Sequence, residues 1–240
     1  KPRTTSLAVS AEVEHVALHT DRRYEEDLAH LRQLILEMGG LVERQIGDAT
    51  ASLAAADRAR AEQTIERDHQ VNRYDVDIDE ECLRLLALHQ PAARDLRLIT
   101  TSLKITTDLE RIGDMAVNIC ERAIDLSAKP APLQVDLPRM ADTVRKMLRE
   151  SLDAFVREDA DLALSVCKED DVIDALHAQM FAEVLGRMTH DPSLVVVGTA
   201  QLFVSKYLER IADHATNIAE MVIFMVKGKS IRHLSVPASI

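Results

Sequence analysis

Apolar residues recur at steps of three and four over long stretches of the chain, which is the spacing of one face of an α-helix. The first stripe runs from Leu28 to Ala56. Further stripes lie at 65–88, 96–126, 140–155, 162–188 and 194–226. Proline-containing breaks separate several of them, at 90–91, 129–138 and 191–193. The pattern predicts six helices, several of them near 30 residues and therefore about 45 Å long.

The chain also repeats itself with an offset of roughly one hundred residues. The segment ERIGDMAVNICE at 110–121 returns as ERIADHATNIAE at 209–220. We therefore predict an all-α fold of two tandem antiparallel three-helix bundles with left-handed crossings. The expected divisions are a loose tail at 1–20, a first bundle at 21–129, a linker at 130–138, a second bundle at 139–230 and a tail at 231–240.

The last helix of each copy carries acidic and amide side chains at steps of four, four and three, which places them on one face. These are Glu110, Asp114, Asn118 and Glu121 in the first copy and Glu209, Asp213, Asn217 and Glu220 in the second. The middle helix adds a pair one turn apart, Asp68 and Asn72 in the first copy and Asp170 and Asp174 in the second. Because carboxylates one turn apart repel each other, the repeated stripe requires a compensating cation.

Two adjacent helices that both offer oxygen ligands form a platform for one or more hard or borderline cations. Arg111 and Arg210 follow the first glutamates and could supply part of the compensating positive charge, but one residue along a helix they are expected to point about 100° away. Gly113 lies within the predicted helix and indicates a close approach of another helix beside the acidic stripe. The alternative is that the stripes are only the solvated polar faces of amphipathic helices.

Composition restricts the function further. The chain has 29 basic and 40 acidic residues and a net charge of −11, which disfavours nucleic acid and anionic membrane surfaces as partners. Its three cysteines are far apart and are expected to be reduced core thiols, which together with the lack of a secretion signal or a membrane-spanning stretch predicts a cytoplasmic protein. Phosphate-binding loops and hydrolase motifs are absent, and the partial Glu-x-x-His pattern is not repeated in both copies.

Several of these segments resemble the PhoU family, the phosphate signalling proteins associated with bacterial phosphate import. The similarity covers roughly residues 20–235. It is carried by LILEMGGLVERQI at 34–46, HQPAARDLRLI at 89–99, the two LERI-[GA]-D segments with their following N-I-x-E, and KGKSIRHL at 227–234. The resemblance implies two PhoU-type three-helix bundles in the order that the repeat predicts.

The resemblance also implies multinuclear iron or zinc clusters held on the surface by E/D-x-x-x-D pairs. In this chain those pairs are Glu110 with Asp114, Glu209 with Asp213, and Asp170 with Asp174; Asp68 matches, but Asn72 replaces the expected aspartate. We therefore expect weaker binding, or a different number of ions, at the first platform. The implied partners are the ATPase subunit of the phosphate ABC importer, a sensor histidine kinase and a second copy of the chain.

The leading hypothesis is a non-enzymatic, metal-binding adaptor. It would hold the phosphate-starvation response off when phosphate is plentiful, couple the importer to the kinase and modulate phosphate uptake. One alternative is a carboxylate-bridged multinuclear metalloenzyme that uses the same platforms. The other is a purely structural helical protein whose acidic stripes are solvated surface.

Overall fold

The computed structural model describes residues 5–127 and 136–229, with side chains described from residue 22 onward. Within these ranges every regular element is helical. The helices are α1 (Thr5–Ala55), α2 (Arg58–His89), α3 (Ala93–Ser127), α4 (Leu137–Arg157), α5 (Ala160–His190) and α6 (Val195–Lys227), with a single 3₁₀ turn at Pro192–Leu194. The six predicted helices are therefore confirmed.

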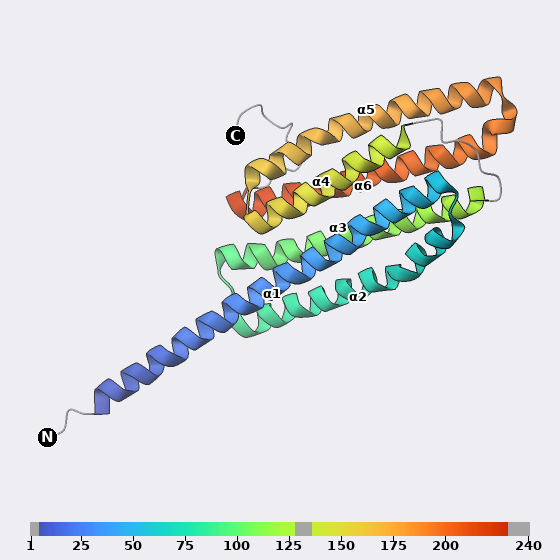
Figure 1. Cartoon of the computed structure of the whole chain (residues 1–240). Coiled ribbons are helices and arrows are strands. Elements are labelled where there is room, and N and C mark those ends of the chain that lie inside the picture. The colour runs from blue at the N-terminus through green and yellow to red at the C-terminus, as the bar shows by residue number, and fades with distance from the viewer. Residues whose placement is uncertain (1–4, 128–135, 230–240) are drawn as a thin grey trace.

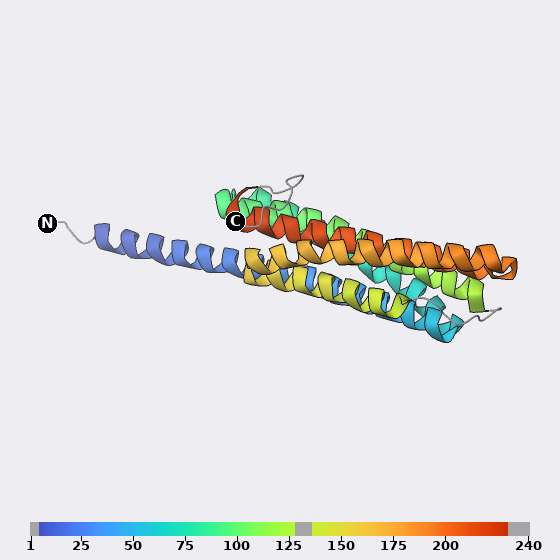
Figure 2. The same cartoon turned by 90° about the horizontal axis from the view of Figure 1, so that it is seen from above.

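The helices form two antiparallel three-helix bundles, α1–α2–α3 and α4–α5–α6, which lie side by side (Figure 1). Seen from above, the helices of both bundles run along nearly the same direction, and the bundle of α4, α5 and α6 lies over the other (Figure 2). Between the bundles, α3 packs on α6 and α1 packs on α4. One continuous apolar core runs through both bundles and includes residues from all six helices. The predicted fold of two tandem bundles is confirmed.

Individual contacts show that the helix pairs between the bundles are antiparallel. Arg97 near the start of α3 contacts Met225 near the end of α6, whereas Asp108 further along α3 contacts His214 earlier on α6. In the other pair, Arg32 contacts Glu158 just after the end of α4, whereas Glu43 further along α1 lies 3.6 Å from Arg145 earlier on α4. The two bundles are thus related by an approximate two-fold axis, as expected for two copies of one unit packed face to face.

The repeat is also visible in the turn that joins the first two helices of each bundle. Ala56 and Glu158 both have left-handed backbone conformations, with φ of 53° and 52°. The following residue caps the next helix in both copies: the Asp57 carboxylate accepts from a backbone N–H of α2, and the Asp159 carboxylate accepts from two in α5. The same local chemistry therefore reverses the chain at both places.

The predicted boundaries differ from the structure at two places. Residues 5–20, which we expected to be a loose tail, belong to α1, whose N-terminal part extends past the bundles (Figure 1). That stretch has no glycine or proline, the residues that most disfavour a helix interior. Pro138, expected in the linker, lies in the first turn of α4, where its missing N–H is not needed. The rest of the expected linker and the tail at 231–240 lie outside the described residues.

The cysteines are free thiols, as the sequence predicts. Cys82 and Cys120 are buried in the core and Cys167 is half-buried. Burial raises the pKa of all three thiols to about 12. They therefore act as small apolar side chains rather than as reactive thiolates.

Asp27 links α1 to the end of α2. Its carboxylate lies 2.9 Å from the Arg84 guanidinium and 3.5 Å from the His89 ring. The hydrogen bond from Arg84 lowers the pKa of Asp27, and the charge of Arg84 and the contact with His89 act in the same direction against the effect of burial. The ionised carboxylate is therefore the form that stabilises the fold.

We expect Asp27→Asn to reduce the free energy of unfolding by about 1 kcal/mol at pH 7. Because the pKa of Asp27 is lower in the folded state than in the unfolded state, this stabilisation is present above about pH 4 and is lost as the pH falls through the folded-state pKa. Urea unfolding at pH 7 and at pH 3 measures the difference. Glu26→Gln, in an exposed pair with Arg22, is the control and should change stability little. An equal loss in the Asp27 variant at both pH values would contradict the prediction.

Candidate functional site

Four carboxylates from α2 and α3 lie together on the first bundle. We call this group the first acidic face: Asp68 and Asp75 on α2, and Glu110 and Asp114 on α3. Burial raises the pKa of Glu110, and the charge of Asp114 is the next largest cause, followed at a lower level by Asp75 and Asp68. Asp68 likewise has a raised pKa, through burial and then through the charge of Asp114. The face therefore holds like charges close together across two helices.

The position of Asp68 is fixed from α1 and from its own helix. The buried Gln45 amide donates to Asp68 Oδ1 at 3.2 Å, and the Asn72 amide donates to Oδ2 at 3.3 Å. The amide oxygen of Gln45, Oε1, is buried without a hydrogen-bond partner. A Cβ atom on Gly113 would lie 3.3 Å from Asp68 Oδ1 and 3.4 Å from Gln45 Oε1. The predicted close helix approach at Gly113 is therefore confirmed.

The second bundle repeats the arrangement. Its second acidic face consists of Asp170 and Asp174 on α5 and of Glu209 and Asp213 on α6. Burial raises the pKa of Asp170 to about 6, and the charges of Asp213 and Asp174 contribute in that order. Asp213 has a raised pKa through burial and then through Glu209. The structure thus brings together the carboxylates that the sequence assigned to each platform.

Each face also has a cationic side chain close to its carboxylates. The long Arg111 side chain was expected to point away, but it bends back so that its guanidinium lies 3.6 Å from Glu110 and 3.7 Å from Asp114. On the second face, Lys206 pairs with Glu209 at 2.5 Å. Angular spacing on a helix describes where Cβ points, and a flexible side chain can reach round from there.

The other predicted positions continue the stripe beyond the two faces. Glu121 is half-exposed and lies 3.5 Å from Arg122. Glu220 lies beside Cys167 of α5, where its charge is the second cause, after burial, of the raised thiol pKa. Asn118 and Asn217 are half-buried between these positions and the acidic pairs. These four side chains extend the polar stripe along α3 and α6.

The carboxylates form open faces rather than closed ligand cages. In the part of the chain whose side chains are described, no three or more His, Cys, Asp or Glu side chains converge in a geometry that could hold a metal ion. The donor set is nevertheless suited to a hard or borderline cation, because it is made of oxygens whose mutual repulsion a cation would relieve. Water would have to complete the coordination of an ion at such a face.

Three contributing residues were missed from the sequence. Asp75 follows Asn72 by three residues and so lies on the same helix face, a signal that was available. Lys206 precedes Glu209 by three residues and could have been found in the same way. For Gln45 the signal was weaker. It is a polar residue three positions after Val42, and so lies on the buried face of α1.

Two successive three-helix bundles, each with an acidic face on its last two helices, define a duplicated helical-bundle protein. The chain belongs to the PhoU family: it matches the family model described as the PhoU domain twice, over residues 35–123 and 137–222. These two matches coincide with the two bundles. No helix among the described residues is both long and apolar enough to cross a membrane.

Relatives and solved structures agree with this assignment. The chain is 43% identical to a "phosphate-specific transport system accessory protein PhoU homolog" of Pseudomonas putida over 92% of this chain and 87% of that protein. It is 36% identical to the PhoU accessory protein of Escherichia coli over 90% of both chains. The crystal structure of PhoU from Pseudomonas aeruginosa superposes with a TM-score of 0.83 at 43% identity, over 86% of this chain and all of that one. A PhoU structure from Streptococcus pneumoniae gives 0.80 at 32% identity, over 86% of this chain and 98% of that one.

The like charges of the second acidic face give a testable effect on stability. In chelator-treated protein we expect Asp170→Asn to raise the melting temperature by a few degrees, because it removes a carboxylate whose ionised form the fold disfavours. With Zn²⁺ added, the wild-type chain should gain more stability than the variant, because the variant has lost an oxygen charge.

Thermal unfolding with and without Zn²⁺ checks both parts. Asp125→Asn is the matched control, since Asp125 is exposed on α3 and pairs with Arg122. It should leave both melting temperatures nearly unchanged. A lower melting temperature for metal-free Asp170→Asn would show that the second face is not under like-charge repulsion.

Proposed function

We propose that this protein is a regulatory accessory component of phosphate transport that holds the phosphate-starvation response off when phosphate is plentiful. The observation that carries the proposal is the match of both bundles, over about nine-tenths of the chain, to proteins named phosphate-specific transport system accessory proteins. Sequence similarity over both bundles supports a shared role more strongly than similarity of fold alone would.

In this role the chain is an adaptor and not an enzyme. Its partners are the ATPase subunit of the phosphate ABC importer and a sensor histidine kinase, and it acts in the cytoplasm as a homodimer that restrains both signalling and phosphate uptake. The net charge of −11 favours basic surfaces on these partners.

We also propose that the acidic faces bind iron or zinc. Asp170, Asp174, Glu209 and Asp213 would hold the ions of the second face, and Asp68, Asp75, Glu110 and Asp114 those of the first. The first face has an amide at Asn72, and Arg111 lies close to both Glu110 and Asp114, whereas Lys206 pairs with Glu209. The amide of Asn72 is a weaker ligand for a cation than the carboxylate of Asp174 at the matching position, so the second face is the stronger site.

The regulatory role is tested in the source bacterium with this gene deleted and phosphate abundant. We expect high alkaline phosphatase activity in the deletion strain, and a return to low activity when the wild-type chain is supplied. Low activity in the deletion strain, with no change on complementation, would contradict the proposal.

The metal proposal is tested by elemental analysis of protein purified without added metal. We expect at least about one bound iron or zinc ion per chain, and a larger loss in Glu209→Gln/Asp213→Asn than in Glu110→Gln/Asp114→Asn. Well under one ion per chain would favour the purely structural alternative. Turnover of phosphoesters or dioxygen by metal-loaded protein that disappears in Asp213→Asn would favour the metalloenzyme.

A further inference from the structure

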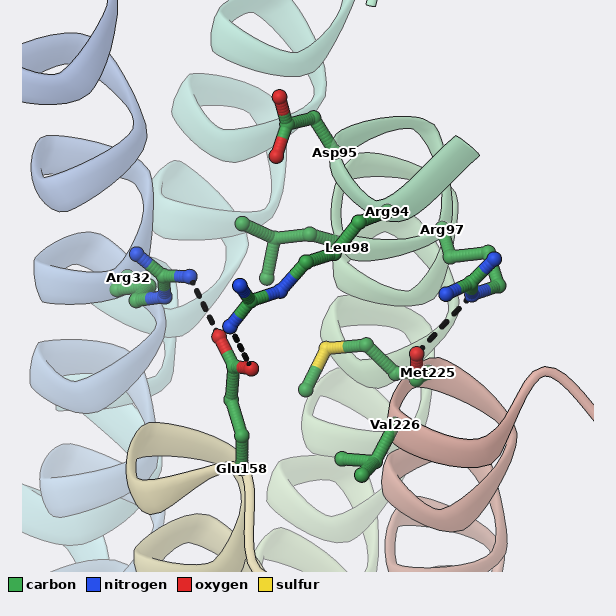
Figure 3. Close-up of a pocket in the computed structure, with 8 residues that line it drawn as sticks. All are labelled: Arg32, Arg94, Asp95, Arg97, Leu98, Glu158, Met225 and Val226. Carbon is green, nitrogen blue, oxygen red and sulfur yellow. Dashed lines mark hydrogen bonds and ion pairs between the residues drawn. The ribbon is translucent and has the colours of Figure 1, made fainter. Parts of the chain in front are cut away.

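A further cavity lies between the two bundles, where the ends of α3, α4 and α6 meet the middle of α1. It is a pocket of about 400 Å³, lined by Arg32 of α1, by the first turns of α3, by Glu158 after α4 and by the end of α6. Figure 3 shows guanidinium groups converging on it from different helices. The pocket is separate from both acidic faces and contains none of their carboxylates.

The polar groups of the pocket centre on one carboxylate. Arg32 donates to Glu158 Oε1 at 3.0 Å, and Arg94 pairs with the other oxygen (Figure 3). Arg97 donates from Nε to the backbone carbonyl of Met225 at 3.0 Å. Asp95 is the second acidic side chain of the lining and is drawn well apart from Glu158. Three arginines therefore face two carboxylates, in a protein whose overall charge is strongly negative.

The local backbone at position 158 disfavours a glutamate. Its backbone is left-handed, with φ of 52°, and it ends a helix, where the macrodipole repels a negative side chain. The equivalent turn in the first bundle has Ala56 at this position with the same conformation, so the turn does not require a glutamate. The acidic side chain is therefore explained by the arginines that it reaches and not by the turn.

The arginines are likewise not part of the repeated unit. The first copy has Arg94 and Arg97 shortly after Pro91, whereas 193–205 after Pro192 contains neither arginine nor lysine. Although Arg32 is bound to Glu158 through its terminal nitrogen, its Nε is buried and has no hydrogen-bond partner. The cluster thus has one arginine more than it has carboxylates, and one of its guanidinium nitrogens is left without an acceptor.

We infer that this pocket binds a small phosphate ester, whose phosphate group takes the place of the Glu158 carboxylate between Arg32 and Arg94. Two guanidinium groups match the oxygens of a phosphate dianion, and the start of α3 adds the positive end of its dipole. The organic part of the ester contacts Leu98, Met225 and Val226, which form the apolar side of the pocket.

The size of the pocket favours an ester over free phosphate. Its volume of about 400 Å³ lies within the range of small-molecule sites and exceeds what one tetrahedral anion fills. Glu158 acts as an internal competitor that keeps the arginines paired when no ligand is bound. Displacing it would release the end of α4 from α1 and α3, so that the ligand acts on the contact between the bundles. This inference goes beyond the proposed regulatory function and does not depend on it.

The test is isothermal titration calorimetry on the full chain after chelator treatment, which excludes binding through metal on the acidic faces. The probes are phenyl phosphate, inorganic phosphate and phenol. We expect saturable binding of phenyl phosphate, at least about fivefold weaker binding of inorganic phosphate and none of phenol. Failure of phenyl phosphate to bind would overturn the inference, and equal affinity for inorganic phosphate would overturn the assignment to an ester.

Two variants and a control locate the binding. Arg94→Gln, at a largely exposed side chain, should weaken phenyl phosphate binding by about tenfold or more. Glu158→Gln should strengthen it by about tenfold, since the competing charge is removed while the backbone can stay as it is. Arg58→Gln, in an exposed pair with Glu62 on α2, should have no effect. Unchanged binding in Arg94→Gln, or weaker binding in correctly folded Glu158→Gln, would overturn the inference.

Discussion

The packing of α3 against α6 is the contact on which the rest of the structure depends. These helices are the last of each bundle, and both carry an unusually long series of buried residues. Near the middle of the contact His214 Nδ1 lies 2.7 Å from Asp108 Oδ1, with both side chains largely shielded from water. One side of each of these two helices packs within its own bundle, and another side packs on the other bundle. The two bundles therefore share one core.

This arrangement explains how the acidic faces can exist. Carboxylates that raise one another's pKa oppose folding, and an isolated pair of helices would separate or rotate to relieve the repulsion. Here α3 and α6 are held on their opposite sides by extensive apolar packing, so the faces keep their charges in place. The repulsion between the carboxylates costs little free energy compared with what burial of the core contributes. A cation that binds to a face relieves this repulsion and so stabilises the fold.

The sequence was sufficient for the number and order of the helices and for the grouping of the main carboxylates. A sustained apolar stripe defines a helix well, and the span expected at 194–226 differs from α6 by only one residue at each end. The repeat placed Asp170 and Asp213 on neighbouring helices because both copies had to fold alike. Periodicity could not show that Arg111 bends back to its own acidic pair, since that depends on the rotamers of a long side chain.

The pocket between the bundles could not be predicted from the sequence either. Its lining includes Arg32, Arg94, Glu158 and Met225, which no local pattern connects. They meet only when the ends of α3, α4 and α6 pack beside the middle of α1. The N-terminal extension of α1 was missed for a different reason. Its sequence permits a helix without the regular apolar stripe by which the other helices were recognised.

The shared core has a consequence for the history of the chain. Each copy retains the turn, the cap and the acidic face of a common unit, but α3 and α6 each bury a side that a lone three-helix bundle would expose to water. A single copy would present that apolar side to solvent and would have to pair with a second copy to cover it. The antiparallel arrangement of α1 with α4 and of α3 with α6 is the symmetry that such a pair would have. The present chain is therefore organised as a two-fold dimer whose subunits have become covalently joined.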